Sequence, residues 1–128
     1  MASELRVNTL KDAAGNNSVA MQYVAEGTAK AWINFNGTGT IAARDSLNVS
    51  GLVDGGTGDY TVSFSSAFSN SDYAPVANGS ESTGGTGELS SRNVIVRTLN
   101  TTNFKLYNYG GAMKDYILNY VATHGDLA

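Results

Sequence analysis

The segment from residue 29 to 64 constrains the fold most, because it combines a two-residue hydrophobic alternation with glycine-rich turns. The alternation is typical of strands that have one apolar and one polar face. Residues 36–39 (NGTG) and 54–59 (DGGTGD) tolerate the positive φ angles that tight reversals between antiparallel strands require. The residues expected on the apolar face are Ala31, Ile33, Phe35, Tyr60, Val62 and Phe64.

The rest of the composition favours strands over helices. Gly, Asn, Ser and Thr fill 53 of the 128 positions, and charged residues reach only 15%. These residue types are poor helix formers and common in turns. Because this length suits one domain, we expect an all-β protein built as an antiparallel β-sandwich of jelly-roll-like type, without a helix of note.

The chain divides into a short N-terminal arm and one larger domain. Residues 1–18 are expected to form an extended arm or first strand, and residues 19–128 a single sandwich domain, with a strand at 19–24. Pro75 is the only proline, and it indicates an edge strand because proline cannot donate a hydrogen bond to a neighbouring strand. Residues 79–91 (GSESTGGTGELSS) are expected to form a long exposed loop, either a binding loop or a plain spacer.

Three further strands are expected at 93–100, 103–109 and 115–123. The last of them carries apolar side chains on both faces, whereas a small sandwich has only one interior. Tyr116, Leu118 and Tyr120 are therefore expected to form an oligomer interface, unless the tyrosines simply lie at the rim with their polar tips in water.

Charge and cysteine content exclude several functional classes. The net charge of −3 and the pI near 4.9 provide no positive field for nucleic acid. The absence of cysteine excludes disulfides and thiolate metal sites and suits a reducing cytoplasm. The sequence contains neither a signal peptide nor a long apolar run, so we expect no secretion and no membrane insertion.

Signatures of catalysis are also missing. The only histidine is His124, which leaves little basis for a Ser-His-Asp triad or a histidine metal site. Residues 37–42 (GTGTIA) match a dinucleotide-binding pattern, but strands flank them where a helix should follow. We expect no catalytic residue, no metal and no cofactor, and we interpret the aspartates as turn formers.

Carbohydrate binding has general support from the residue types present. Sugars bind to aromatic faces and to neutral hydrogen-bonding side chains, and the chain contains one tryptophan, seven tyrosines and many asparagines. Trp32 is expected in the core or in an interface. Tyr73, Tyr107 and Tyr109 lie beside turns and are better candidates for surface contacts.

The segment AKAWINFNGTGTIAARDSLNVSGLVDGGTGDYTVSF resembles a recurrent segment of bacteriophage and prophage tail fibre or tail-associated proteins. The shared pattern is AWxNFNGTGT, then NVS, then DxGTGDYTVxF. The opening SELRVNTLKDAAGNNS resembles the lead segment of such proteins. The resemblance covers the first half of the chain and carries no binding residue with it, because its Asn, Gly and Asp residues are turn formers.

This resemblance implies a virion protein of the tail, made in the host bacterial cytoplasm and assembled as a homotrimer at a tail fibre tip. Its function would be receptor binding for host attachment, through non-enzymatic contacts with a surface glycan or protein. The N-terminal arm would be available to dock another tail or capsid protein. Exposed loop positions give the expected receptor-binding residues: Ser82, Thr83, Glu88, Asn100, Asn103, Tyr107 and Tyr109.

Three alternatives remain open at this point. The first is a capsid decoration or tail adaptor subunit that contacts only other virion proteins. The second is a glycan-binding, lectin-like module. The third, a glycan-cleaving enzyme, requires two closely spaced carboxylates, which the sequence does not indicate.

Overall fold

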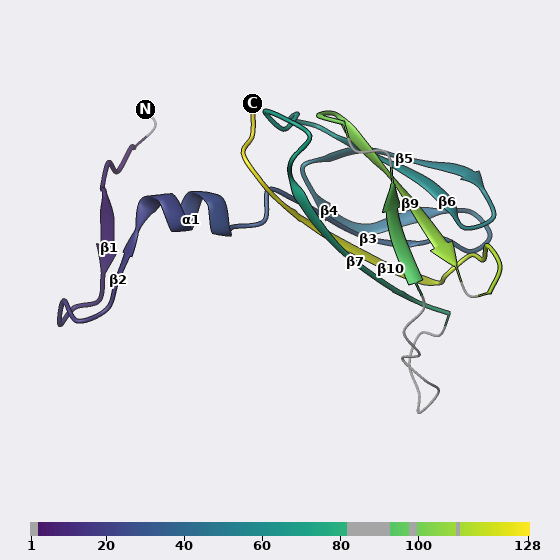
Figure 1. Ribbon diagram of the computed structural model, residues 1–128, viewed down its shortest axis with the longest axis horizontal. Coiled ribbons are helices and arrows are strands. Elements are labelled where there is room, and N and C mark those ends of the chain that lie inside the picture. The colour runs from purple at the N-terminus through teal and green to yellow at the C-terminus, as the bar shows by residue number, and fades with distance from the viewer. Residues whose placement is uncertain (1–2, 82–92, 98–99, 110) are drawn as a thin grey trace.

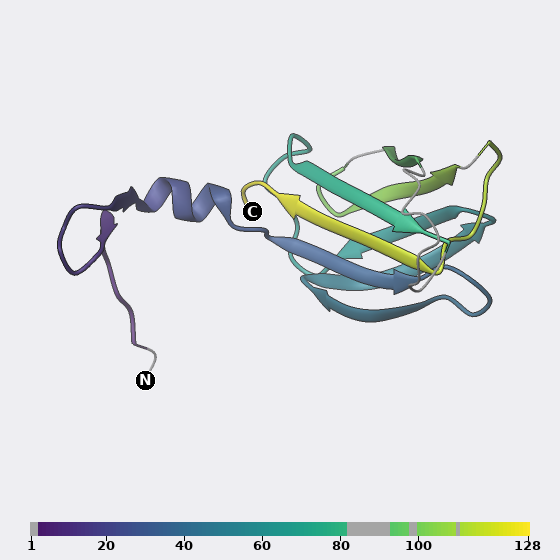
Figure 2. The ribbon, with the colours of Figure 1, turned by 90° about the horizontal axis from the view of Figure 1, so that it is seen from below.

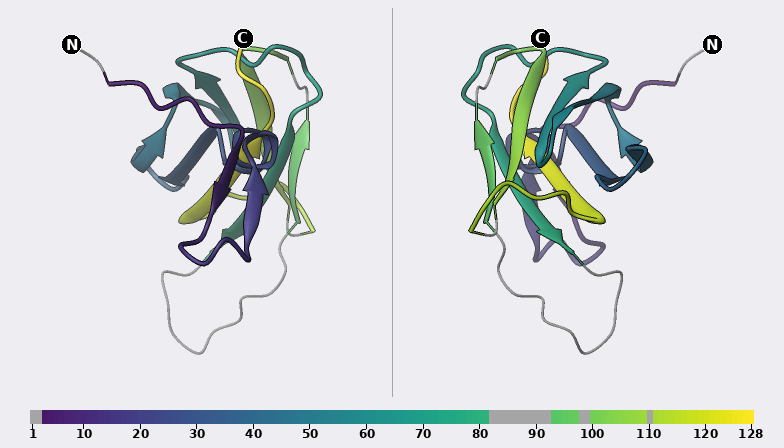
Figure 3. Two further views of the ribbon diagram at one scale, coloured as in Figure 1. Left: turned by 90° about the vertical axis from the view of Figure 1, so that its left-hand side faces the viewer. Right: turned by 90° about the vertical axis from the view of Figure 1, so that its right-hand side faces the viewer.

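Two antiparallel β-sheets face each other and form a sandwich (Figures 1 and 3). The computed structural model describes residues 3–81, 93–97, 100–109 and 111–128. Each sheet has four strands, and every pairing within them is antiparallel. The expected all-β sandwich is therefore confirmed.

The first sheet has the order β4-β3-β10-β7. Pro75 lies in β7 at the edge of this sheet, as the sequence predicts, because an edge strand leaves one side of its backbone unpaired. The strands are β3 (Ala31–Asn36), β4 (Ala42–Leu47), β7 (Ala74–Ser80) and β10 (Leu118–His124).

The second sheet has the order β5-β6-β9-β8. The hairpins of the sandwich are β3–β4, β5–β6 and β8–β9, and its first strand, β3, lies beside its last, β10. The eight strands thus form an antiparallel β-sandwich of two facing sheets, whose strand order differs from that of the expected jelly-roll-like type. The strands are β5 (Val49–Gly56), β6 (Asp59–Phe64), β8 (Asn93–Arg97) and β9 (Asn103–Tyr109).

The N-terminal part stands apart from the sandwich (Figures 1 and 2). It consists of a hairpin of β1 (Thr9–Lys11) and β2 (Ser18–Ala20), followed by helix α1 (Met21–Gly27). We refer to residues 3–30 as the arm. The sandwich begins at Ala31, so the arm is longer than the 18 residues expected from the sequence.

Helix α1 corrects two sequence expectations, a strand at 19–24 and the lack of a notable helix. Met21, Gln22, Ala25 and Glu26 are good helix formers, and they outweigh the β-favouring Tyr and Val between them. The helix has no buried residue. No helix in the described part of the chain is long and apolar enough to cross a membrane.

Inward-facing side chains of both sheets form one apolar core. β3, β6 and β9 alternate between buried and half-buried residues, up to the exposed Tyr109 at the end of β9, as the two-residue period predicts. Aromatic rings pack edge to face, with the ring centroids of Phe35 and Tyr60 5.1 Å apart and those of Phe64 and Phe68 4.8 Å apart. The fully buried large side chains include Ile33, Phe35, Tyr60, Val62, Phe68, Phe104, Leu106 and Tyr116.

At one end of the sandwich, hydrogen bonds of Asp115 and Tyr60 connect the turn at Gly37, the turn at Gly58 and the segment that contains Asp115. Asp115 Oδ1 accepts a hydrogen bond from the backbone N of Gly58 (2.7 Å) and lies 2.8 Å from the Tyr60 hydroxyl. That hydroxyl is also 2.9 Å from the carbonyl oxygen of Gly37. Burial, and then the bond to Asp115, raise the pKa of Tyr60 above its usual 10.0. The buried Tyr60 hydroxyl thus holds the Gly37 turn, and the Asp115 carboxylate holds the Gly58 turn, both of which the sequence predicts.

Candidate binding face

The outer face of the first sheet carries a row of apolar side chains across all four strands. Trp32 of β3 pairs with Leu47 of β4 and with Ala122 of β10, and Ala122 pairs with Val76 of β7. These side chains point away from the core, because their neighbours Ile33 and Val121 are buried. The row is therefore open to solvent, and Val76 is 67% exposed.

A second row beside it is polar and is centred on a tyrosine. Tyr120 of β10 lies between Asn34 of β3 and Asn78 of β7, and Asn34 pairs further with Asp45 of β4. Tyr120 is 42% exposed. The two rows place two aromatic side chains and two amides on one surface, which we call the outer face.

The outer face contains a hollow of about 390 Å³. Among its lining residues, the small Ala122 lies between its larger strand partners Trp32 and Val76. No charged residue lines the hollow, although it lies on a protein whose net charge is −3. Its outward-pointing residues are Trp32, Asn34, Val76, Asn78, Tyr120 and Ala122.

Neighbouring groups hold both amides in defined orientations. The Oδ1 atom of Asn34 accepts a 3.3 Å bond from Arg44, whose guanidinium also donates to the carbonyl oxygen of Ile117 at 2.7 Å. The Oδ1 atom of Asn78 accepts a 2.7 Å bond from the backbone N of Gly79. Because Asn78 is exposed, its Nδ2 group is the part of this amide that a ligand would meet.

Trp32 was expected in the core or in an interface, and the structure places it half-buried on the outer face. Tyr73, a candidate surface contact, is only 4% exposed, and its hydroxyl lies within hydrogen-bond distance of two carbonyl oxygens, 2.9 Å from that of Asn100 and 3.1 Å from that of Asn103. The prediction that Tyr73 makes surface contacts is therefore wrong. Asn34, Val76 and Asn78 were not singled out from the sequence, because only strand pairing brings them next to Trp32 and Tyr120.

The expected interface residues fall on two different sides of the sheet. Leu118 and Tyr120 lie on the outer face, half-buried and exposed respectively. Tyr116 does not share that face, since β10 begins only at Leu118 and the Tyr116 ring is fully buried in the interior. An interface formed by this face would therefore use Leu118 and Tyr120 without Tyr116.

Two of the expected receptor-binding residues form a turn between β8 and β9. The Oδ1 atom of Asn100 accepts bonds from the backbone N of Thr102 and of Asn103, both at 2.8 Å. Its Nδ2 group donates to Asn103 Oδ1 at 2.9 Å. Both side chains are therefore engaged in holding the turn, although Asn100 is exposed.

The other expected residues lie on or near the second sheet. Tyr107 is half-buried, with the Arg97 guanidinium carbon 5.6 Å and the Lys105 Nζ 5.9 Å from its ring centroid. Tyr109 ends β9 and is 44% exposed. Neither lies near the turn formed by Asn100 and Asn103 at the start of the same strand, so the structure does not gather them into one site. Ser82, Thr83 and Glu88 lie outside the described residues.

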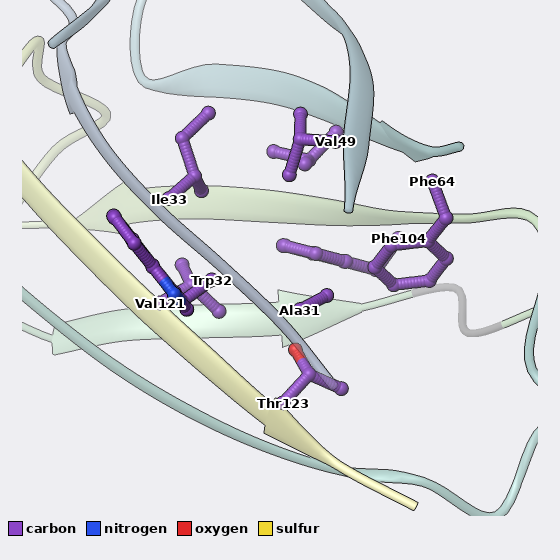
Figure 4. A pocket seen from close by; sticks show the side chains of 9 residues that line it. Ala31, Trp32, Ile33, Val49, Phe64, Phe104, Val121 and Thr123 are labelled. Carbon is purple, nitrogen blue, oxygen red and sulfur yellow. The ribbon is translucent and has the colours of Figure 1, made fainter. Parts of the chain in front are cut away.

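The space between the sheets is not a binding cavity. Side chains from both sheets meet at one end of the sandwich (Figure 4). The volume left for a water-sized molecule is close to 0 Å³. This region is packed core, lined by Ala31, Ile33, Val49, Val62, Phe64, Phe104, Val121 and Thr123, and bordered by the half-buried Trp32.

A second hollow, of about 310 Å³, lies where α1 approaches the sandwich. Its lining includes Glu26, Asp72, His124 and Asp126. Despite these titratable groups, no cluster of three or more His, Asp or Glu side chains in the described ranges is arranged to hold a metal ion. The outer face, with its aromatic and amide groups, is therefore the stronger candidate for binding.

Comparison with known proteins finds no match to a protein-family model, to a curated protein or to a solved structure. The likeness to phage tail proteins accordingly rests on the residues of the sequence itself, chiefly those between 31 and 64. It remains a prediction about the class of protein.

Proposed function

We propose that this chain is a bacteriophage virion protein of the tail, at a tail fibre tip or in a tail-associated position. It binds the host cell surface as a homotrimer and catalyses no reaction. The observation that carries this proposal is the arm, a folded extension without buried residues attached to a sandwich that bears an exposed aromatic face.

The arm needs a partner to be stable. A two-stranded hairpin is marginal in water by itself, and a helix of seven residues is too short to persist alone. Leu10 and Val19 pair across the hairpin and are both exposed. Leu5 and Tyr23 are 81% and 70% exposed. Copies of the arm packed together would bury these side chains, which supports assembly through the arm.

The charge of the arm permits such packing. Its described charged residues balance, with Glu4, Asp12 and Glu26 against Arg6, Lys11 and Lys30. Glu4 and Arg6 already form an ion pair at 2.9 Å. Copies of a neutral arm approach one another without net repulsion. Assembly through the arm leaves the outer face of each sandwich free for the host surface.

Attachment by this arrangement would depend on several weak contacts. A single small groove binds a ligand weakly, and three linked copies multiply the effective affinity without any new contact. The purified, fluorescently labelled full chain should therefore adsorb to some strains in a bacterial panel. A monomeric variant carrying Leu10→Ser and Tyr23→Ser should adsorb much less. If the full chain adsorbs to no strain in the panel, the proposal fails.

A capsid decoration or tail adaptor subunit is the second candidate, and the same observation favours it, because the arm is equally suited to dock another virion protein. Antibody labelling of intact particles separates the two functions. Label at the distal end of the tail supports host attachment, whereas label on the capsid or at an internal tail joint supports the second candidate.

A further inference from the structure

We propose that the hollow on the outer face is a binding site for a neutral sugar ring, with Trp32 and Tyr120 as the stacking side chains and Asn34 and Asn78 as the hydrogen-bonding ones. The proposal deepens the proposed function, on which its role in host attachment rests. It names both a location and a ligand class for that attachment.

The shape of the hollow suits a flat ligand with one apolar face. A pyranose ring presents C–H groups on one side and hydroxyl groups around its edge. The small Ala122 side chain lines the hollow between the paired residues Trp32 and Val76, and the larger Trp32 and Tyr120 line it from the adjacent strands β3 and β10. Aromatic surfaces of this kind bury the C–H side of a sugar and gain its apolar contact area.

The amides suit the hydroxyl edge of the same ligand. Asn34 and Asn78 lie on either side of Tyr120, one on β3 and one on β7. Each is oriented by a bond to its Oδ1 atom, from Arg44 and from the Gly79 backbone respectively. The Nδ2 groups are donors for sugar oxygens, and little side-chain entropy remains to be lost when a ligand binds.

The lack of charge argues for a neutral ligand. The nine residues that line the hollow include no Asp, Glu, Lys or Arg. The Arg44 guanidinium lies beside the hollow but already donates to Asn34 Oδ1 and to the Ile117 carbonyl oxygen. The net charge of −3 disfavours the approach of an anionic sugar. The ligand class is therefore an uncharged glycan.

Two features argue against a second copy of the chain as the occupant. A concave surface set against an identical concave surface leaves a void, and voids forfeit packing energy. Half of the outward-pointing residues in the polar row are amides, which a dry interface would have to pair. A sugar fills the hollow and pairs those amides at the same time.

The intrinsic fluorescence of Trp32 provides a test of the proposed site. Trp32 is the only tryptophan in the chain, so selectively excited fluorescence reports on this hollow alone. The full-length protein is titrated with maltotriose, cellotriose, triacetylchitotriose and mannotriose, with trigalacturonate as the charged comparison. We expect a saturable change in Trp32 emission with at least one neutral trisaccharide and none with trigalacturonate.

Three variants test whether the change in Trp32 emission comes from a sugar bound in the hollow. Tyr120→Ala removes a stacking ring and keeps the reporter, and it should weaken binding about tenfold. Asn78→Asp keeps the oxygen that accepts from Gly79 but removes the amide donor, and it should weaken binding by a similar factor. Val53→Ala is the control, because Val53 is 57% exposed but lies in β5 of the other sheet. It should leave binding unchanged.

Several results would overturn the site. These are no saturable change with any neutral trisaccharide, unchanged affinity in Tyr120→Ala and Asn78→Asp, or an equal loss in Val53→Ala. Emission that varies with protein concentration and not with sugar would mean that a second copy covers the face. Asn78 is exposed on an edge strand, so its variant tests the site even if Tyr120→Ala fails to fold.

The site and the proposed function fail in different ways. If Tyr120→Ala and Asn78→Asp adsorb to cells as well as the unmodified chain, the site is wrong and the attachment function stands. If the pure protein binds a neutral trisaccharide through these residues but adsorbs to no strain, the site stands and the attachment function fails.

Discussion

Asn108 and Asn119 join the two sheets through the core, because the Nδ2 group of Asn108 in β9 donates a 2.7 Å hydrogen bond to Oδ1 of Asn119 in β10. Both residues are fully buried. The Nδ2 group of Asn119 donates in turn to the carbonyl oxygen of Tyr116 at 2.8 Å. Buried amides of this kind cost stability when a partner is lost, so the pair fixes how one sheet lies on the other.

Replacing Asn119 should therefore destabilise the sandwich. Asn119→Ala leaves the Asn108 Nδ2 group without its Asn119 acceptor and removes one of the two hydrogen bonds to the Tyr116 carbonyl oxygen, which the backbone N of Gly37 also donates to at 2.9 Å. It should lower the free energy of unfolding by about 2–4 kcal/mol. Urea unfolding followed by circular dichroism measures this. Asn8→Ala, at an exposed position of the arm, is the control and should change stability by less than about 0.5 kcal/mol.

The double variant Asn108→Leu with Asn119→Leu tests the pairing itself. Removing both amides should cost less than the sum of the two single changes, because neither amide is then left unpaired. Strictly additive losses in a double-mutant cycle would show that the two side chains act separately.

Gly37 should not tolerate a side chain. A Cβ atom there would overlap the Tyr60 hydroxyl and lie 2.9 Å from the carbonyl oxygen of Tyr116, in the buried end of the sandwich. Gly37→Ala should therefore reduce stability by about 2–4 kcal/mol in thermal or urea unfolding. The matched control is Gly27→Ala at the end of α1, where a Cβ meets nothing within 4 Å and stability should stay level or rise slightly. Equal effects of the two changes would contradict the packing described for Tyr60.

Stability should fall in alkaline solution because of two buried tyrosines. Burial raises the pKa of both Tyr60 and Tyr73 above the usual 10.0, so the unfolded chain ionises first. Their contribution is complete below pH 10 and is lost as the pH rises above it, by at most about 1.4 kcal/mol per pH unit for each tyrosine. Urea midpoints measured at pH 9 and pH 11 test this. In Tyr73→Phe the dependence should be weaker, and an unchanged dependence would rule Tyr73 out as a source.

The hairpin of the arm should respond to acid through Asp12. Its carboxylate accepts hydrogen bonds from the Asn17 Nδ2 group at 2.6 Å and from the backbone N of Asn16 at 2.9 Å. These bonds, chiefly the one from Asn17, hold the pKa of Asp12 below its usual 3.8. The ionised carboxylate therefore stabilises the hairpin fully above pH 3.8, and this stabilisation is lost as the pH falls through the lowered pKa of Asp12. Amide chemical shifts of Asn16 and Asn17 should titrate with a midpoint below 3.8, and a midpoint at or above 3.8 would mean that the bonds do not form in solution.

Much of the sandwich follows from local sequence signals. Ala31, Ile33 and Phe35 alternate with Trp32 and Asn34, and that period alone predicts which side of β3 is buried. The glycine turns are predictable for a similar reason, since Gly39 and Gly58 adopt φ angles of 63° and 67° that other residues disfavour.

The binding face was less predictable because it depends on strand order. Trp32, Val76 and Tyr120 are far apart in sequence. They come together only because β3, β10 and β7 are neighbouring strands in the first sheet. The sequence wrongly predicted that Tyr116 shares a face with Leu118 and Tyr120. The strand alternation was extended back to Tyr116, whereas β10 begins at Leu118. No local signal in the sequence marks that starting point.

Native mass in solution tests the central claim, assembly as a trimer for host attachment, most directly. Light scattering on a sizing column should give about three times the chain mass of 13.4 kDa for the full chain, because the exposed side chains of the arm need partners. A mass near 13.4 kDa at all protein concentrations would contradict the trimer and favour a subunit that assembles only on the particle.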